Sequence, residues 1–303
     1  MSQNFPAIRL VALDLDGTLL NREGKVTPRT RDALAAAHAR GVVIVPATGR
    51  PLASLPPVVA QLPGVRYAIT SNGAAVWDLG SDPLAAVHSR YANAAQHHTT
   101  EPVCLLRHLF PTEKAREVFS LFLEYEGELS VFSDGLCIKT PEGIARLQAR
   151  TGKYLSTEAR QRLDDGRFTV IAGIESWMAR HAHEIEKLCM FFDDVPTAQT
   201  ALPRFRALGD VEVVQGSPDN IEVTAAGVDK GEAVLALAGR LGIDHAATLA
   251  VGDSENDRAM LEKAGVSAVM ANGMPEIKAV ADLVSEADCD HDGVAEILEK
   301  LGI

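Results

Sequence analysis

The chain has 303 residues, of which 47% are hydrophobic and 23% are charged, and its formal net charge is −12. This composition is ordinary for a soluble globular protein, and the length allows about two domains. The acidic balance argues against nucleic acids and anionic membrane surfaces as partners. No segment has the length and apolarity of a transmembrane helix, no secretory signal is visible, and the four cysteines form no C-x-x-C pair. We therefore expect a cytoplasmic protein, and its oligomeric state stays open.

The first 80 residues alternate apolar runs with helical segments. The runs, which we expect to be buried strands, lie at residues 10–14, 42–47 and 67–71. A helix is predicted over residues 28–40, because Thr27 suits an N-cap, Pro28 a first helical position and Gly41 a C-terminal stop. Repeated strand and helix predict a parallel sheet that helices cover on both faces.

The pattern changes after about residue 82 and has no clear repeat of strand and helix. Helices are predicted over residues 113–126 and 197–208, and residues 92–102 are expected to form a loop or an irregular strand. Strand-like segments lie at residues 129–132, 136–140, 168–172, 188–192, 211–215 and 221–224. This mixture is typical of an α+β unit.

The alternation of strand and helix returns at residue 228. A further strand is predicted at residues 248–252 and another at 267–270, with helices between and after them. We therefore predict an α/β fold: a doubly wound, Rossmann-like parallel-sheet core made of residues 1–81 and 228–303. An α+β cap of residues 82–227 is inserted into this core.

Polar residues follow four of the apolar runs. In parallel sheets, ligands bind outside the carboxyl ends of the strands. We therefore expect six side chains that are scattered over the sequence to meet in one crevice: Asp14, Asp16, Thr48, Asn72, Asp253 and Asp257.

The first run ends in a pair of carboxylates, Asp14 and Asp16. Two residues that are two positions apart on a strand point the same way, and Gly17 lets the chain turn sharply after them. One carboxylate can attack phosphorus and form an aspartyl phosphate. The other can protonate the leaving oxygen and later deprotonate water. A D-x-D pair is also common in solvated turns, so this motif needs the support of the others.

Thr48 and Lys230 could each bind a phosphoryl group. A threonine hydroxyl at a strand end, with the backbone N–H groups after it, can donate to a phosphoryl oxygen. A lysine at the start of a helix is unfavourable beside the positive end of the helix dipole unless an anion lies in front of it. The ordinary alternatives are a capping threonine and an exposed surface lysine.

Asp253 and Asp257 follow the fourth run and are four residues apart, so they can share one face at the start of a helix. Mg²⁺ favours a few carboxylates together with waters. A bound divalent cation would also screen the charge of an acidic protein that handles phosphate esters. The alternative is that Asp253 or Ser254 is only an N-cap.

Four motifs occur in order along the chain: Asp14-Leu-Asp16-Gly-Thr-Leu, Thr48-Gly-Arg, Lys230-Gly and Gly252-Asp253-x-x-Asn256-Asp257. This set resembles the four motifs of the haloacid dehalogenase (HAD) superfamily. The insert resembles the type IIB cap of its Cof-like hydrolase branch, which three further segments also match: Ser71-Asn72-Gly73-Ala74, Asn220-Ile-Glu-Val223 and Asp292-Gly293-Val294. The resemblance spans nearly the whole chain, and several independent patterns agree.

The resemblance implies roles for the core residues. Asp14 would be the nucleophile and Asp16 the general acid–base. Thr48 and Lys230 would hold the transferring phosphoryl group. Four further residues would order the phosphate pocket: Gly49, Arg50, Asn72 and Asn256.

The resemblance also implies Mg²⁺ as cofactor. Its ligands would be Asp14, the main-chain carbonyl of Asp16 and Asp253, with Asp257 as an outer or water-mediated ligand. Residues 288–299 separately fit the EF-hand calcium pattern D-x-D-x-D-G-x5-E. The segment before them predicts a short strand and turn instead of the helix that an EF-hand needs, so we expect Asp292 to N-cap the last helix. Calcium binding there stays an open alternative.

The function that the resemblance implies is a Mg²⁺-dependent phosphatase, a phosphoric monoester hydrolase. Its substrate would be a small phosphorylated metabolite, with a sugar phosphate as one candidate. A phosphomutase or phosphotransferase would share every motif and return the phosphoryl group to a second substrate. A catalytically silent phosphate-binding regulatory module is the alternative from another class, although all four motifs are intact. A dehalogenase is disfavoured, because cleaving a carbon–halogen bond needs neither Asp16 nor a metal.

Overall fold

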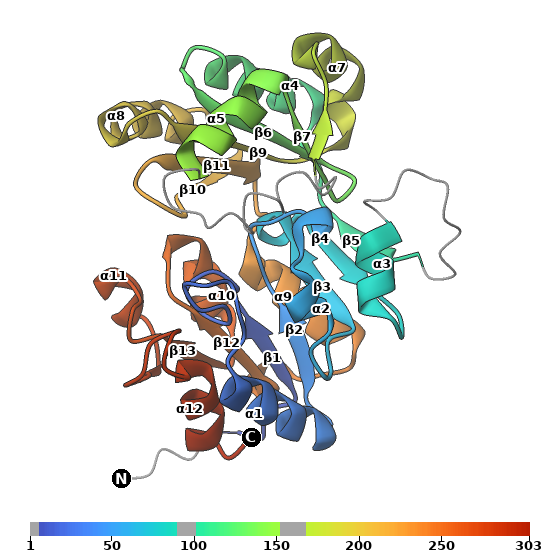
Figure 1. The fold of residues 1–303 in the computed structure, drawn as a ribbon, viewed down its shortest axis with the longest axis vertical. Helices are drawn as coiled ribbons and strands as arrows, with labels where there is room; N and C mark the ends of the chain where they lie inside the picture. Colours follow the sequence, from blue (N-terminus) through green and yellow to red (C-terminus); the bar gives the residue numbers. More distant parts are fainter. Residues whose placement is uncertain (1–5, 90–100, 152–167) are drawn as a thin grey trace.

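We describe the computed structural model of the chain over residues 6–89, 101–151 and 168–303. Within these residues a parallel sheet with the order β14-β13-β12-β1-β2 forms the core, in the lower half of Figure 1. Its strands are β1 (Leu10–Leu13), β2 (Val43–Pro46), β12 (Thr248–Gly252), β13 (Val266–Val269) and β14 (Leu283–Val284). The last residue of β1, Leu13, is opposite Val251 of β12 and Pro46 of β2. The residues that follow these three strands therefore lie side by side.

Helices cover both faces of the core sheet, as predicted. Val11 and Leu13 pack with α1 and α12 on one face, whereas Leu10 and Ala12 pack with α9 and α10 on the other. This division follows because successive side chains of a strand point to opposite faces. The helices are α1 (Pro28–Ala39), α2 (Pro57–Ala60), α9 (Lys230–Arg240), α10 (Arg258–Lys263), α11 (Pro275–Lys278) and α12 (Gly293–Lys300).

Helix α1 begins and ends where its flanking residues predict. The Thr27 side chain accepts a hydrogen bond from the Thr30 backbone N–H, and Pro28 is the first helical residue. Gly41, just beyond the end, has a φ of 85°, in the left-handed region that ends many helices at a glycine. Local chain chemistry therefore accounts for this element.

The third predicted strand lies beside β2 and then turns back on itself. Isolated parallel bridges join Ile44 of β2 to Val65, just before β3 (Tyr67–Thr70), and Ala47, just after β2, to Ile69 of β3. β3 pairs antiparallel with β4 (Ala75–Asp78), which pairs with β5 (Val103–Arg107). The short turn η2 (Ser71–Gly73) joins β3 to β4, and a turn of this length permits only an antiparallel neighbour. The sequence pattern predicts the strand but not the hairpin that follows it.

The segment after β4 packs against the core before the chain reaches the cap. Helix α3 (Pro83–Ser89) joins the apolar cluster on one face of the core sheet. The backbone N–H of His108 donates to Ala74 in the core, whereas that of Phe110 donates to Ile185 in the cap. The limits of the insert stay a prediction, and we propose that the chain first crosses to the cap between His108 and Phe110.

A separate mixed sheet forms the cap, in the upper half of Figure 1, and it confirms the predicted α+β architecture. Its order within the described residues is β10-β11-β9-β6-β7-β8. The strands are β6 (Gly127–Ser133), β7 (Leu136–Lys139), β8 (Phe168–Val170), β9 (Ile185–Phe192), β10 (Val211–Val214) and β11 (Asn220–Ala225). The helices are α4 (Thr112–Phe122), α5 (Pro141–Thr151), α7 (Ile174–His181) and α8 (Val195–Arg206). The sequence pattern did not predict α5 and α7, and most of the predicted loop at residues 92–102 lies outside the described residues.

The outer face of the cap sheet holds the apolar core of the cap. Phe122, Met178 and Phe205, from three of the helices, pack in one buried cluster with Val131 and Leu188 of the strands. The opposite face of the sheet is thus left to line a cavity between cap and core. No helix within the described residues has the length and apolarity to cross a membrane.

Candidate active site

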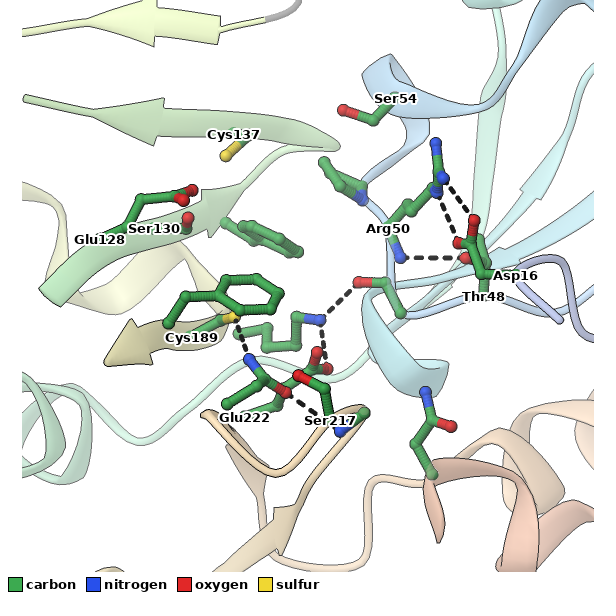
Figure 2. A pocket seen from close by; sticks show the side chains of 18 of the residues that line it. Asp16, Thr48, Arg50, Ser54, Glu128, Ser130, Cys137, Cys189, Ser217 and Glu222 are labelled. Carbon is green, nitrogen blue, oxygen red and sulfur yellow. Dashed lines mark hydrogen bonds and ion pairs between the residues drawn. The ribbon is translucent and has the colours of Figure 1, made fainter. Parts of the chain in front are cut away.

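A cavity of about 490 Å³ lies between the carboxyl edge of the core sheet and the inner face of the cap sheet. Figure 2 shows Asp16, Thr48 and Arg50 on its core side, and Glu128 and Ser130 on its cap side. Of the six side chains predicted to meet, those of Asp14, Asp16 and Thr48 line this cavity, at the edge of the sheet where ligands bind in such folds.

Buried charges stand on the cap face of this cavity. Lys139 Nζ donates to Glu128 Oε1 over 2.5 Å, and Lys187 Nζ donates to Glu222 Oε2 over 2.6 Å. The polar residues fall at alternate positions of strands β6, β7, β9 and β11, because one face of each strand points into the cavity. Gly216 and Ser217, from the turn before β11, line the cavity too.

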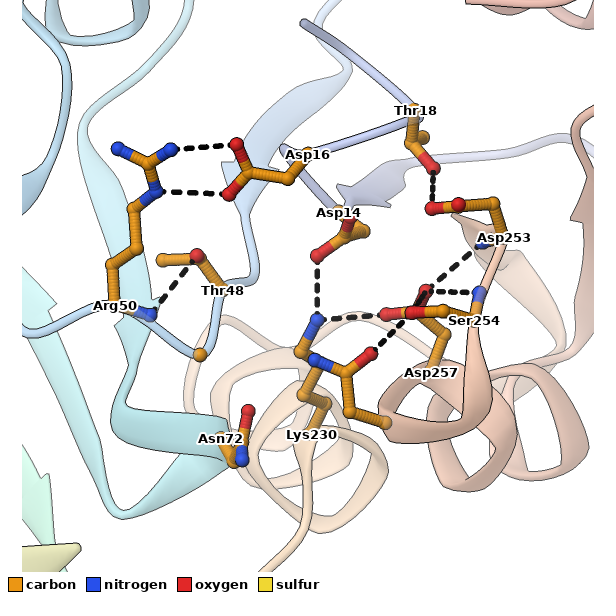
Figure 3. Close-up of polar contacts among 12 residues, drawn as sticks. Asp14, Asp16, Thr18, Thr48, Arg50, Asn72, Lys230, Asp253, Ser254 and Asp257 are labelled. Carbon is orange, nitrogen blue, oxygen red and sulfur yellow. Dashed lines mark hydrogen bonds and ion pairs between the residues drawn. The ribbon is translucent and has the colours of Figure 1, made fainter. Parts of the chain in front are cut away.

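Lys230 lies at the centre of the core site (Figure 3). It is the first residue of α9, is fully buried, and its Nζ lies 2.6 Å from Asp14 Oδ1 and 2.7 Å from Asp257 Oδ1. Burial by itself would lower the pKa of Lys230, but the carboxylates of Asp14 and Asp257 raise it well above its ordinary value. The lysine is therefore a fixed cation below the nucleophile predicted at Asp14.

Asp14, Asp253 and Asp257 form a cluster of carboxylates that could hold a metal ion, each offering one oxygen within 4.8 Å of the others. Burial raises the pKa of Asp14 well above its ordinary value, and the charge of Asp257 adds to this, against the opposing effect of Lys230. Burial and Asp257 likewise raise the pKa of Asp253 to about 7. So many anions in a buried site favour a bound cation, which would stabilise their ionised forms.

Asp257 has no carboxylate oxygen free of protein donors. Its Oδ1 accepts from Lys230, and its Oδ2 accepts from the backbone N–H groups of Asp253, at 2.9 Å, and Ser254, at 3.1 Å. These bonds orient the Asp253–Ser254 turn toward Asp14. They suit the outer position that the family resemblance implies for Asp257.

Asp16 points away from the carboxylate cluster and pairs with Arg50. The Arg50 Nε donates to Asp16 Oδ2 over 2.9 Å and its Nη2 to Oδ1 over 2.6 Å. Partial burial would raise the pKa of Asp16, but the guanidinium outweighs it and lowers this pKa. The side chain of Asp16 therefore lies outside the metal-binding group, and the resemblance assigns its main-chain carbonyl to the metal.

Gly17 brings the first motif close to the last. It has a φ of 89°, and a Cβ at this position would lie 2.5 Å from Asp253 Oδ2. The adjoining Thr18 hydroxyl donates to Asp253 Oδ1 over 3.0 Å. The sharp turn predicted after Asp16 is therefore confirmed, and any side chain at Gly17 would clash with the carboxylate of Asp253.

The other predicted pocket residues divide into two groups. Thr48 is buried beside the cavity, and its Oγ1 accepts from the Arg50 backbone N–H over 3.1 Å. Asn256 lies on the cavity wall, and its Oδ1 accepts from the Ser254 hydroxyl over 2.6 Å. Asn72 instead is buried beside Gly49 and its amide donates to the cap. The roles assigned to these residues stay predictions.

The EF-hand pattern does not form an EF-hand. The short strand β14 precedes it, and Glu299, which would be its last ligand, lies on α12 and accepts two bonds from the guanidinium of Arg29. Asp292 occupies the N-cap position of α12, as predicted, but it has a φ of 67° and its side chain makes no capping bond. Sequence spacing could not show this, because the ligand set depends on backbone conformation.

A family model of haloacid dehalogenase-like hydrolases matches residues 11–298. The chain belongs to this family. This hydrolase is 27% identical to 5-amino-6-(5-phospho-D-ribitylamino)uracil phosphatase YcsE of Bacillus subtilis (strain 168), over 96% of this chain and 94% of that protein.

Solved structures confirm the fold of the hydrolase. It matches a haloacid dehalogenase-like hydrolase from B. subtilis with a TM-score of 0.77 at 25% identity, over 96% of this chain and 99% of that chain. It also matches a sugar phosphatase of HAD subclass IIB with a TM-score of 0.72 at 22% identity, over 97% of this chain and 99% of that one. The second match is a likeness of fold, and it includes the predicted type of cap.

Sequence reasoning missed the charged residues of the cap. Glu128, Lys139, Lys187 and Glu222 lie on strands and are buried. The available signal was a charged residue inside an otherwise apolar strand, since lysine and glutamate are almost never fully buried unless paired. Which of them pair, and which face the cavity, depends on strand register.

Proposed function

We propose that this hydrolase is a Mg²⁺-dependent phosphatase that acts on a small phosphorylated metabolite through an aspartyl phosphate on Asp14. The observation that carries the proposal is the position of Asp14 on the cavity wall. Asp14 is buried, and its Oδ1 lies 2.6 Å from Lys230 Nζ. It shares a cluster of carboxylates with Asp253 and Asp257. A carboxylate placed between a fixed cation and a candidate metal site suits nucleophilic attack on an anionic phosphoryl group.

The reaction would proceed in two steps. First, an oxygen of Asp14 forms a bond to phosphorus, the bond from phosphorus to the leaving oxygen breaks, and Asp16 gives that oxygen a proton. Thr48 and the Gly49 N–H would donate to the phosphoryl oxygens, while Lys230 offsets the charge of the nucleophile. Second, water attacks the phosphorus of the aspartyl phosphate, Asp16 takes the proton, and phosphate leaves Asp14 as a free carboxylate.

Mg²⁺ fits the donor set of the core. Asp14 and Asp253 would hold it with the main-chain carbonyl of Asp16, and hard oxygen ligands of this number leave room for waters and a phosphoryl oxygen. Asp257 would stay outside the ligand shell, because its oxygens already accept bonds. When bound, the ion supplies positive charge beside the transferring phosphoryl group.

Arg50 would link substrate binding to the acid. In the structure its guanidinium holds Asp16 through two bonds, and this pairing favours the ionised carboxylate. An incoming phosphate would compete for Arg50, and the carboxyl would then take up a proton from solvent and give it to the leaving oxygen. When phosphate departs the pair reforms, and Asp16 releases to solvent the proton that it took from the attacking water.

The cap would select the substrate. The motif residues lie on the core, whereas the far side of the cavity is lined by charged, polar and phenylalanine side chains of the cap. A leaving group that combines hydrogen-bonding groups with apolar surface suits this lining. The name of the relative YcsE describes a phosphorylated ribitylamino-uracil, and a sugar phosphate stays a further candidate.

The test is release of inorganic phosphate from p-nitrophenyl phosphate and from a panel of phosphorylated metabolites, with and without Mg²⁺. We expect release that needs Mg²⁺ and that is strongest for one class of metabolite. Transfer of the phosphoryl group to a second metabolite without phosphate release would favour a phosphomutase or phosphotransferase. Phosphate binding without any turnover would favour the catalytically silent module.

A further inference from the structure

Two buried lysines on the cap face of the cavity each pair with a glutamate, and one of them also contacts the core. Lys139 bonds to Glu128 and lies 5.3 Å from the ring centre of Phe168. Lys187 bonds to Glu222 and lies over a phenylalanine ring at 4.5 Å. Lys187 also donates to the core: its Nζ lies 2.5 Å from the carbonyl oxygen of Gly49.

The bond from Lys187 sets the plane of the Gly49–Arg50 peptide. A trans peptide is planar, so its C=O and N–H point to opposite sides. The C=O accepts from Lys187, and the N–H of Arg50 donates to Thr48 Oγ1 over 3.1 Å. Because the Thr48 hydroxyl already accepts this bond, its own proton is free to be donated toward the cavity.

Gly49 has no space for a side chain. A Cβ there would lie 2.8 Å from Asn72 Oδ1, 3.2 Å from Glu222 Oε2 and 3.3 Å from Lys187 Nζ. The Asn72 amide donates to the same Glu222 oxygen over 2.6 Å. Cap and core side chains thus enclose the peptide from two sides.

We propose that Lys187, held by Glu222, is a positioning residue for the phosphoryl-binding loop of the core. It orients the Gly49–Arg50 peptide, and through it the Thr48 hydroxyl, so that affinity for phosphate depends on contact with the cap. This inference rests on the proposed function, in which Thr48 binds the phosphoryl group. It assigns to a cap residue an effect on the phosphoryl group, separate from any contact with the leaving group.

Contacts that do not involve Lys187 also join the cap to the core. The Ser71 hydroxyl donates to Glu186 Oε2 over 3.0 Å, and the Ala53 N–H donates to the carbonyl of Gly135 over 2.8 Å. A change at Lys187 therefore tests the loop and not the docking of the cap. Replacing both members of a buried ion pair leaves no uncompensated charge and is often close to neutral for stability.

The experiment compares the double variant Lys187→Met/Glu222→Gln with the matched control Lys139→Met/Glu128→Gln. The Glu222→Gln change keeps a carbonyl acceptor for the amide of Asn72. The readout is binding of inorganic phosphate in the presence of Mg²⁺, measured by titration calorimetry on the full chain. We expect the first variant to weaken binding about tenfold or more, the usual effect of losing a bond to a charged group, and the control to stay within about twofold.

Kinetics with p-nitrophenyl phosphate supply a second readout. The loss in Lys187→Met/Glu222→Gln should fall mainly on KM, because the loop binds the phosphoryl group before and during reaction. Equal phosphate affinity in wild type and in this variant, with melting temperatures showing both folded, would overturn the inference. An equal loss in both double variants would overturn it as well. If the wild type binds no phosphate and hydrolyses nothing, the proposed function fails instead.

Discussion

In the core, Lys230 bonds to two of three clustered carboxylates, whereas in the cap the buried Lys139 and Lys187 each bond to a glutamate. Glu128, the partner of Lys139, also bonds to Arg150. The core cluster therefore carries excess negative charge, whereas the cap pairs carry none. Asp14 of the core cluster and both cap pairs lie on the wall of one cavity, so burial alone does not explain the difference.

The comparison indicates what each half of the cavity is built for. Excess anionic charge is costly when buried unless a cation joins it, so the core is suited to a metal ion and to phosphoryl transfer. A balanced pair holds two side chains at fixed positions without requiring a further ion. The Lys187–Glu222 pair is thus suited to orienting the loop, and the Lys139–Glu128 pair to forming polar surface for a leaving group.

The largest expected effect comes from the nucleophile of the core. Asp14→Asn should lower kcat at least about a thousandfold, because an amide cannot attack phosphorus and a lost nucleophile removes the covalent route. Steady-state phosphate release checks this, and circular dichroism shows whether the variant folds. Retention of more than a few per cent of wild-type kcat would remove Asp14 from its assigned role.

The general acid–base offers a graded test of the core chemistry. Asp16→Asn should lower hydrolysis of alkyl phosphates by about 10²–10⁴, the usual contribution of such catalysis. Hydrolysis of p-nitrophenyl phosphate should fall less, because its leaving group needs little protonation. Equal losses on the two substrate types would contradict the assignment.

Removing one lysine from each half tests the difference in charge balance directly. Lys230→Met should destabilise the metal-free protein by about 3–5 kcal/mol, because it leaves the buried carboxylates of Asp14 and Asp257 without their cation. Lys139→Met should cost less, because Arg150 still bonds to Glu128. Mg²⁺ should restore part of the stability of Lys230→Met, since the ion enters the same cluster, and little of that of Lys139→Met. Denaturant unfolding with and without Mg²⁺ measures both, and an equal response of the two variants would break the comparison.

The smallest expected effect is the pH dependence of the stability of the metal-free protein. The pKa of Asp253 is raised from 3.8 to about 7, so between these values the folded state binds more protons than the unfolded state. Stability should therefore fall as pH rises from about 4 to about 7, on the order of 1–2 kcal/mol because the side chain is partly solvated. Thermal melts should show this slope in wild type and a flatter one in Asp253→Asn.

Bound Mg²⁺ should reverse this dependence of stability on pH. The ion favours the ionised carboxylate, so its stabilising effect should grow as pH rises toward 7. A metal-free wild type whose stability rises over this interval would show that the cluster does not carry the excess charge inferred from its geometry.

Sequence by itself determined the elements whose cause is local. Thr27, Pro28 and Gly41 define helix α1, and short apolar runs define the core strands, because capping and hydrophobic patterning depend on neighbours in the chain. The family, the alternating core and the mixed cap were likewise predictable, since several motifs agree along the chain. Strand ends also predicted that Asp14, Thr48 and Asp253 would meet, because parallel strands share one carboxyl edge.

Tertiary structure decided everything that depends on register and on the approach of distant segments. The hairpin after β3, the pairing of Asp16 with Arg50 and the non-EF-hand course of residues 288–299 follow from backbone geometry that no spacing rule contains. The charged cap face shows this most clearly. Lys187 and Gly49 are 138 residues apart, and only the packing of two sheets against one cavity places a cap ammonium on a core peptide.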